Sequence, residues 1–168
     1  MKKGIVGSSV VVLVLLFGQL HFALAEEEQK SMVSPAKMEP ALSQLKTDLN
    51  VGFQELELTV DDTGKLLYRG IKRTDDGEAV SEKSFLLSDI DADSVTTTGN
   101  NILSFACKNH QSCINFSRSE NFKSQRGYER KIALRGDKFP IVSSDPAVAN
   151  KTKQAFQQLI SLFSTTDK

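Results

Sequence analysis

The segment from Pro146 to Phe163 is strongly amphipathic and follows a long run of short alternating segments. Its apolar and small side chains recur every three to four residues along one side (Val148, Thr152, Ala155, Phe156, Leu159, Ile160 and Phe163). This spacing predicts a helix with one buried face. Asp145 is a candidate N-cap, and Pro146 suits the first helical position. Because such a helix must cover an apolar layer, the preceding segments have to supply that layer.

The segments before this helix are typical of antiparallel β structure. Leu56, Leu58 and Val60 alternate with polar residues, which indicates a half-buried strand, and turn residues follow at 61–64 and 75–77. We expect strands at 53–60, 65–73, 79–87, 95–98, 102–106, 114–116, 131–134 and 139–142, with a loop or ragged edge at 118–130. A shorter helix is predicted from Glu39 to Leu49. The chain is therefore expected to be an α+β protein.

Residues 1–25 have the pattern of a signal peptide. Lys2 and Lys3 precede an apolar stretch from Val10 to Phe17, which is shorter than the roughly 20 residues that span a bilayer. The small residues Ala23 and Ala25 form a cleavage site. We expect export to the periplasm or the outside of a bacterium, a flexible arm at 26–38 and one domain at 39–164. An uncleaved anchor is the alternative.

The two cysteines, Cys107 and Cys113, are separated by five residues. In an exported chain such a pair predicts a disulfide. The flanking apolar segments indicate two strands of a hairpin, with the disulfide at its mouth. An alternative is a zinc site that adds His110 and a carboxylate to the two sulfurs. A nucleophilic pair of Cys107 and His110 is the third possibility, and it requires a free thiolate.

Two acidic motifs indicate turns or solvated connections, not a protease site or a calcium site. Asp61 begins an Asp-Asp-Thr-Gly segment, but an aspartic protease needs a second such aspartate and the chain has no second copy. Asp89, Asp91 and Asp93 begin like a calcium loop, but Ser94 and Asn100 stand where that loop needs glycine and glutamate. No Ser-His-Asp set or glycine-rich phosphate loop is recognised in the sequence. We therefore expect neither an enzyme nor a bound metal or cofactor.

Charge is balanced over the whole chain, with 21 basic and 21 acidic residues. This balance argues against a nucleic-acid partner, and no stable membrane insertion is expected once the leader is removed. Between Arg118 and Lys138, however, seven basic residues face three acidic ones. This excess predicts a patch for an anionic partner, with an ordinary charged loop as the alternative. The residues of the predicted patch are Arg118, Lys123, Arg126, Arg130 and Lys131.

The stretch from Phe85 to Phe116 resembles the small bacterial pleckstrin-homology-like (PH-like) domains. It reads Phe-Leu-Leu-Ser-Asp-Ile-Asp, then Asn-Asn-Ile-Leu-Ser-Phe-Ala-Cys, then Ser-Cys-Ile. Six or seven antiparallel strands followed by one helix also match the order of these domains over residues 40–163. The resemblance implies an antiparallel β-barrel of two orthogonal sheets, capped by the C-terminal helix and preceded by a short N-terminal helix.

The same resemblance implies a non-catalytic binding or scaffold module. Its peptide site would be the groove between the final helix and the sheet edge, and its partner a protein, a peptide or an envelope component. Phosphoinositide recognition is not implied, because the first hairpin tip carries Asp61 and Asp62 where lipid-binding relatives carry basic residues. Two other hypotheses stay open. One is an exported α+β protein that binds a small ligand, and the other is a hydrolase with an unrecognised site.

Overall fold

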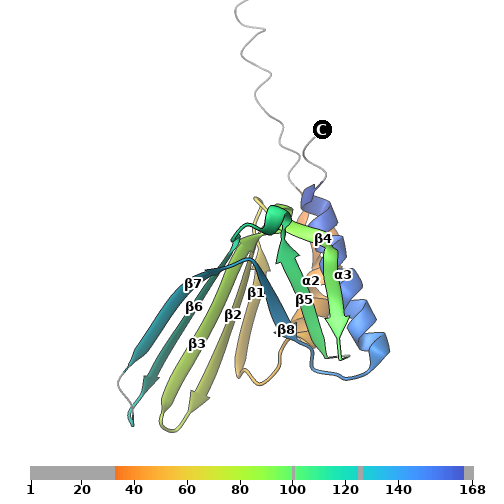
Figure 1. The fold of residues 1–168 in the computed structure, drawn as a ribbon. Coiled ribbons are helices and arrows are strands. Elements are labelled where there is room, and N and C mark those ends of the chain that lie inside the picture. Colours follow the sequence, from red (N-terminus) through yellow and green to blue (C-terminus); the bar gives the residue numbers. More distant parts are fainter. Residues whose placement is uncertain (1–32, 100, 125–126, 165–168) are drawn as a thin grey trace, which may run out of the picture. The chain divides into compact units, whose positions relative to one another are not determined.

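The structure is a computed structural model that describes residues 33–99, 101–124 and 127–164. The predicted signal peptide and residues 26–32 of the predicted arm lie outside these ranges. The described chain runs helix, eight strands, helix (Figure 1). The elements are α2 (Pro35–Asp48), β1 (Glu55–Val60), β2 (Lys65–Thr74), β3 (Gly77–Leu86), β4 (Ile90–Thr98), β5 (Ile102–Cys107), β6 (Ile114–Phe122), β7 (Tyr128–Leu134), β8 (Gly136–Pro140) and α3 (Pro146–Ser164), with short 3₁₀ turns η1 (Leu87–Asp89) and η2 (Lys108–His110).

The strands form two antiparallel sheets, which confirms the predicted α+β class. Sheet A has five strands in the order β1-β2-β3-β6-β7, and sheet B has three in the order β4-β5-β8. Within the described ranges no hydrogen-bonded ladder joins the two sheets. The closed barrel expected from the family resemblance is therefore not formed.

The two helices connect the two sheets. Helix α2 contacts β1 at the edge of sheet A, α3 contacts β4 and β5 of sheet B, and the helices pack against each other. Figure 1 shows α2 lying between β1 and α3. The helix pair therefore links β1 of sheet A to β4 and β5 of sheet B through side-chain packing, without a strand ladder.

An aromatic cluster at the centre holds both sheets and α3 together. Phe105 of β5 lies 5.0 Å from Phe156 of α3 and 5.2 Å from Phe139 of β8, measured between ring centroids. Tyr68 of β2 packs on Phe139 at 4.7 Å, and Phe85 of β3 packs on Phe105 at 5.3 Å. Such aromatic pairs add about 0.5–1.5 kcal/mol each beyond the area they bury. Because the five rings come from five elements, the cluster specifies how the layers meet.

The predicted C-terminal helix is confirmed, with its start at Pro146. Asp145 Oδ1 accepts a hydrogen bond from the Ala147 N–H at 2.8 Å, as an N-cap does. The predicted stripe is buried except for Val148, which is half-buried. At the other end, the ring of Phe163 covers Gly64 in the turn between β1 and β2, so closely that a Cβ there would lie 2.5 Å from the ring.

Helix α2 begins at Pro35, four residues before the predicted start at Glu39. Pro35 occupies the first turn, where a missing N–H is tolerated, and Met38 is buried in the core. The last residue of the helix, Asp48, is also buried. Its carboxylate accepts hydrogen bonds from Gln44 Nε2 at 2.7 Å and from Thr152 Oγ1 of α3 at 2.6 Å. This polar contact ties α2 to α3.

Residues 118–130 differ from the expected loop. The segment up to Phe122 continues β6, and Tyr128 begins β7, so most of it forms a strand hairpin. β6 pairs with β3 along its length, from Ser84 opposite Asn115 to Gly77 opposite Phe122. Polar residues are stable there because much of this end of sheet A is exposed to solvent. Among the described residues, no helix has the length and apolar character needed to cross a membrane.

Candidate functional site

The two cysteines are joined in the structure. Their sulfur atoms lie 2.07 Å apart and their Cα atoms 5.9 Å apart. The expected hairpin around them is wrong, because Cys107 ends β5 in sheet B and Cys113 precedes β6 in sheet A. The physical reason is that Phe105 and Ile114 enter the same core from different sheets. The disulfide therefore closes a crossover between sheets.

A second crossover lies against the first. The Cys107 N–H donates to Arg135 C=O at 2.8 Å, and the Cys113 N–H donates to Leu134 C=O at 3.1 Å. Leu134 ends β7 and Arg135 connects it to β8, so this connection also passes between the sheets. His110, in the disulfide loop, is exposed. A disulfide leaves neither sulfur as the thiolate that the zinc and nucleophile alternatives require.

The predicted anionic-partner patch is distributed over two faces of sheet A. Arg118 lies directly opposite Arg130 in the β6–β7 ladder. Both are on the face of sheet A that also carries Ile114, which is buried in the core. Lys131 is on the opposite face, with Ser117 across from it. Lys123 follows β6, and its Nζ donates to Asp75 C=O at 3.2 Å. Arg126 lies outside the described residues.

Acidic neighbours neutralise part of this charge. Arg118 binds Glu120 through Nε at 2.6 Å. Lys131 Nζ lies 2.8 Å from Glu129 Oε1, and this contact lowers the pKa of Glu129 and raises that of Lys131. Lys131 also borders a hollow of about 420 Å³ that Glu82 lines. Binding of an anion at these residues stays a prediction.

One ion pair joins the two sheets at their inner faces. Lys83 Nζ of β3 lies 2.8 Å from Asp137 Oδ2 of β8, and each side chain is only 14% exposed. The ammonium group also lies 4.7 Å from the Phe139 ring centroid. Burial, and to a smaller extent the negative charge of Asp137, raises the pKa of the neighbouring Tyr68 to about 12. These contacts are those of a structural lock.

The first hairpin uses Asp61 as a turn residue. Its Oδ1 accepts hydrogen bonds from the Thr63 hydroxyl at 2.6 Å, the Thr63 N–H at 2.9 Å and the Lys65 N–H at 2.9 Å. The bond from the Thr63 side chain is the main cause that lowers the pKa of Asp61. Asp91 likewise accepts from the Asp93 N–H at 3.0 Å within sheet B. Both acidic motifs serve the backbone around them.

An apolar pocket of about 640 Å³ lies between α2 and β1. Met38 and Leu42 of α2 form one side, and Leu58 and Val60 of β1 form the other. The polar residues among its lining are Ser34, Glu39, Lys46, Thr59 and Asp62. A volume in this range is typical of ligand sites.

The strand beside this pocket has a free edge. β1 pairs with β2 and with no other strand of the described chain. The Asp61 N–H donates to Lys65 C=O at 3.1 Å, which closes the hairpin. Because antiparallel ladders alternate, Thr59 then bonds to β2, while Leu58 and Val60 direct their N–H and C=O groups away from it. An unpaired backbone row thus lies next to an apolar pocket.

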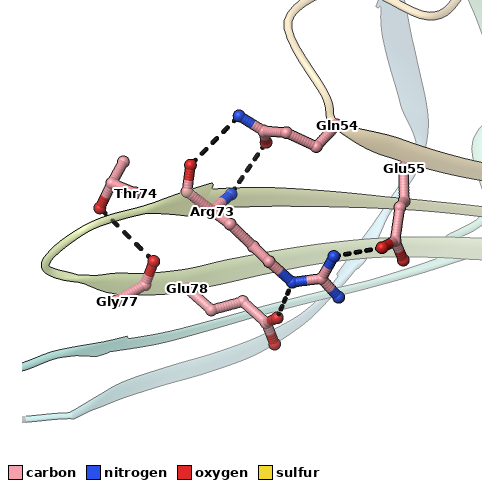
Figure 2. Close-up of polar contacts among 6 residues, drawn as sticks. All are labelled: Gln54, Glu55, Arg73, Thr74, Gly77 and Glu78. Atoms are coloured by element: carbon pink, nitrogen blue, oxygen red, sulfur yellow. Dashed lines mark hydrogen bonds and ion pairs between the residues drawn. The ribbon is translucent and has the colours of Figure 1, made fainter.

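The outer face of β1 is acidic. Glu57 lies opposite Arg69, but their charged atoms are 3.9 Å apart. Glu55 bonds to Arg73, whose Nε also lies 2.8 Å from Glu78 Oε2 (Figure 2). The bond to Arg73 is the main cause that lowers the pKa of Glu55.

Sequence reasoning missed the pocket. The groove expected from the resemblance lies beside α3, but this pocket lies beside α2, on residues that include Met38 from the predicted arm. The signal was present, since Met38 and Leu42 are four residues apart and extend the stripe of Leu45 and Leu49 toward the N-terminus. Comparisons with family models, with curated proteins and with solved structures found no match to this chain.

Proposed function

We propose that this protein is a non-catalytic, exported binding module that captures an extended segment of a partner protein or envelope component at the pocket between α2 and β1. The observation that carries the proposal is the free backbone edge of β1 beside an apolar pocket of about 640 Å³. An extended segment that pairs with an edge strand gains main-chain hydrogen bonds, and alternate side chains enter the neighbouring pocket.

The arrangement also suits such a ligand energetically. β1 is six residues long, and Gln54 extends its pairing with β2 by bonding through its side-chain amide to the backbone of Arg73, at 2.8 and 3.1 Å (Figure 2). An edge strand of this length limits pairing to a short segment. Val33 and Val60, which line the pocket and are half-buried, supply apolar contact area.

Export is part of this proposal. The leader-like residues 1–25 and the joined cysteines support it, since disulfides persist in oxidising compartments. The PH-like resemblance also stays a proposal. The order of antiparallel strands followed by α3 supports it, but the lack of a ladder between the two sheets in the described residues and the pairing of β3 with β6 depart from the expected barrel.

A small-ligand carrier is the second candidate. The pocket volume and its mostly apolar lining favour it, because small-molecule sites combine an apolar cavity with a few polar groups. Native mass spectrometry separates the candidates. A small molecule that co-purifies with the protein, and that is absent from the pocket variant Val60→Arg, favours the carrier.

The test of the main proposal is selection of peptides from a random displayed library on the purified protein. Val60→Arg places a charge in the pocket, and Leu67→Arg makes the same change at a half-buried position of β2 that does not line it. Circular dichroism and thermal melts check that both variants fold. Selected peptides are expected to lose at least about tenfold in affinity on Val60→Arg alone. Equal affinity for both variants, or no selected peptide, would refute the proposal.

A further inference from the structure

The two sides of β1 present different chemistry to a strand that would pair with its edge. Side chains of a strand alternate between faces. Leu58 and Val60 point to the pocket side, and Glu55 and Glu57 point to the outer side with about half of each side chain exposed, 57% and 50%. The edge therefore has an apolar row of side chains on one face and an acidic row on the other. An added strand would place its alternate side chains beside these two rows.

The acidic row is only partly neutralised within the molecule. Glu57 meets Arg69 at 3.9 Å, the longest of the ion pairs in the described chain. Arg69 lies opposite Glu82 as well as Glu57 in the sheet, so one positive charge faces two carboxylates. Two further carboxylates, Glu39 and Asp62, border the pocket against the single cation Lys46. The surroundings of the free edge are therefore net acidic.

From these two rows we infer the chemistry of the occupant: an extended segment in which basic residues alternate with apolar ones. The apolar side chains enter the α2–β1 pocket, and the basic side chains lie opposite Glu55 and Glu57 on the outer face. Opposite charges facing each other across strands are stabilising, and like charges are destabilising. This inference rests on the proposed function, and it names the class of segment that the site selects.

The same charges argue against a second copy of this chain as the occupant. Antiparallel pairing of two β1 strands about a two-fold axis would bring the glutamate row of one copy against that of the other. Like charges at facing positions oppose such a contact. Charged side chains at an edge are also a known means of preventing self-association of sheets.

The experiment compares three labelled hexapeptides by fluorescence anisotropy on the purified protein. One alternates lysine with leucine or valine, one replaces its lysines by glutamates, and one groups the same lysines and apolar residues in two blocks. The alternating lysine peptide is expected to bind at least about tenfold more tightly than the other two, and salt is expected to reduce the difference. Glu57→Lys is expected to reverse the order of the lysine and glutamate peptides.

Glu129→Lys is the matched control, because Glu129 is an exposed glutamate on the same outer face at the opposite edge, β7. Equal affinities of the lysine and glutamate peptides, both lost in Val60→Arg, would overturn the alternation and leave the peptide site standing. Equal affinities of the alternating and block peptides would overturn it too. A reversal by Glu129→Lys instead of Glu57→Lys would place binding elsewhere. Failure of every peptide to bind would count against the site itself.

Discussion

Replacing Thr152 by valine tests how α2 is held against the rest of the protein. Thr152 is fully buried in α3, and its hydroxyl donates to the carboxylate of Asp48, which is 5% exposed. Asp48 is the last residue of α2, where the negative end of the helix dipole disfavours a carboxylate. The hydroxyl therefore compensates a buried negative group that has one other side-chain donor, Gln44.

Valine keeps the shape of threonine and removes the donor. A hydrogen bond to a charged group contributes about 1.5–3 kcal/mol, and the partner left behind is buried. We expect Thr152→Val to lower the free energy of unfolding by about 2–3 kcal/mol, and to lower Tm by roughly 5–10 °C. Thr152→Ser keeps the hydroxyl and loses one methyl group, so about 1 kcal/mol is expected for it. Urea denaturation measures both.

A double-mutant cycle completes this test. Asp48→Leu combined with Thr152→Val removes both partners, so the pair is expected to be less destabilising than the sum of the single changes by about 1–2 kcal/mol. A valine variant as stable as the serine variant, or additive effects in the cycle, would refute the reasoning. In that case the helix is held by the apolar contacts of Leu45 and Leu49 alone.

Three further predictions concern the packing of the sheets. Gly64→Ala is expected to lower the free energy of unfolding by about 2–4 kcal/mol, because Gly64 has φ +80° and the new Cβ would lie 2.5 Å from the Phe163 ring. Gly52→Ala is the control: Gly52 has φ +73° but no atom within 4 Å of a new Cβ, so the expected loss is about 1 kcal/mol. Equal urea midpoints of the two variants would contradict the packing of Phe163 on Gly64. Because the pKa of Tyr68 is raised from 10.0 to about 12, the unfolded chain releases this proton first, and up to about 2.7 kcal/mol of stability is lost as pH rises from about 10 to 12; a Tyr68→Phe variant with the same pH profile would disprove it. Lys83→Ala is expected to lower the free energy of unfolding by about 2–3 kcal/mol, because it leaves the nearly buried carboxylate of Asp137 without its ion-pair partner. Lys83→Met combined with Asp137→Leu removes both charges and is expected to cost clearly less. Thermal melts compare the variants, and equal losses would show that the ion pair does not hold the sheets together.

The elements that sequence predicted best are those whose local pattern is complete. The C-terminal helix combines a cap, a first-turn proline and a continuous apolar stripe, so its start at Pro146 follows from local chemistry. β1 is similar, since strict alternation from Glu55 to Val60 states which residues are buried. In both, the signal lies within a few residues of the structure it specifies.

Strand neighbours were beyond such reasoning. Alternation identifies the buried face of a strand but not its partner, so β5 and β6 read as one hairpin although each belongs to a different sheet. The polar segment from Arg118 to Phe122 read as a loop because its ladder with β3 comes from far along the chain. The basic residues were grouped by sequence, and the strand period then places Arg130 and Lys131 on opposite faces.

The order in which the chain visits its sheets has a consequence for folding. Three strands of sheet A come first, β4 and β5 then begin sheet B, β6 and β7 return to sheet A, and β8 completes sheet B. Contacts of high sequence separation slow folding, since loop-closure entropy opposes them until they form. Neither sheet can be finished while the other is absent, so neither is a separable fragment, and melting of the described chain should be a single cooperative event.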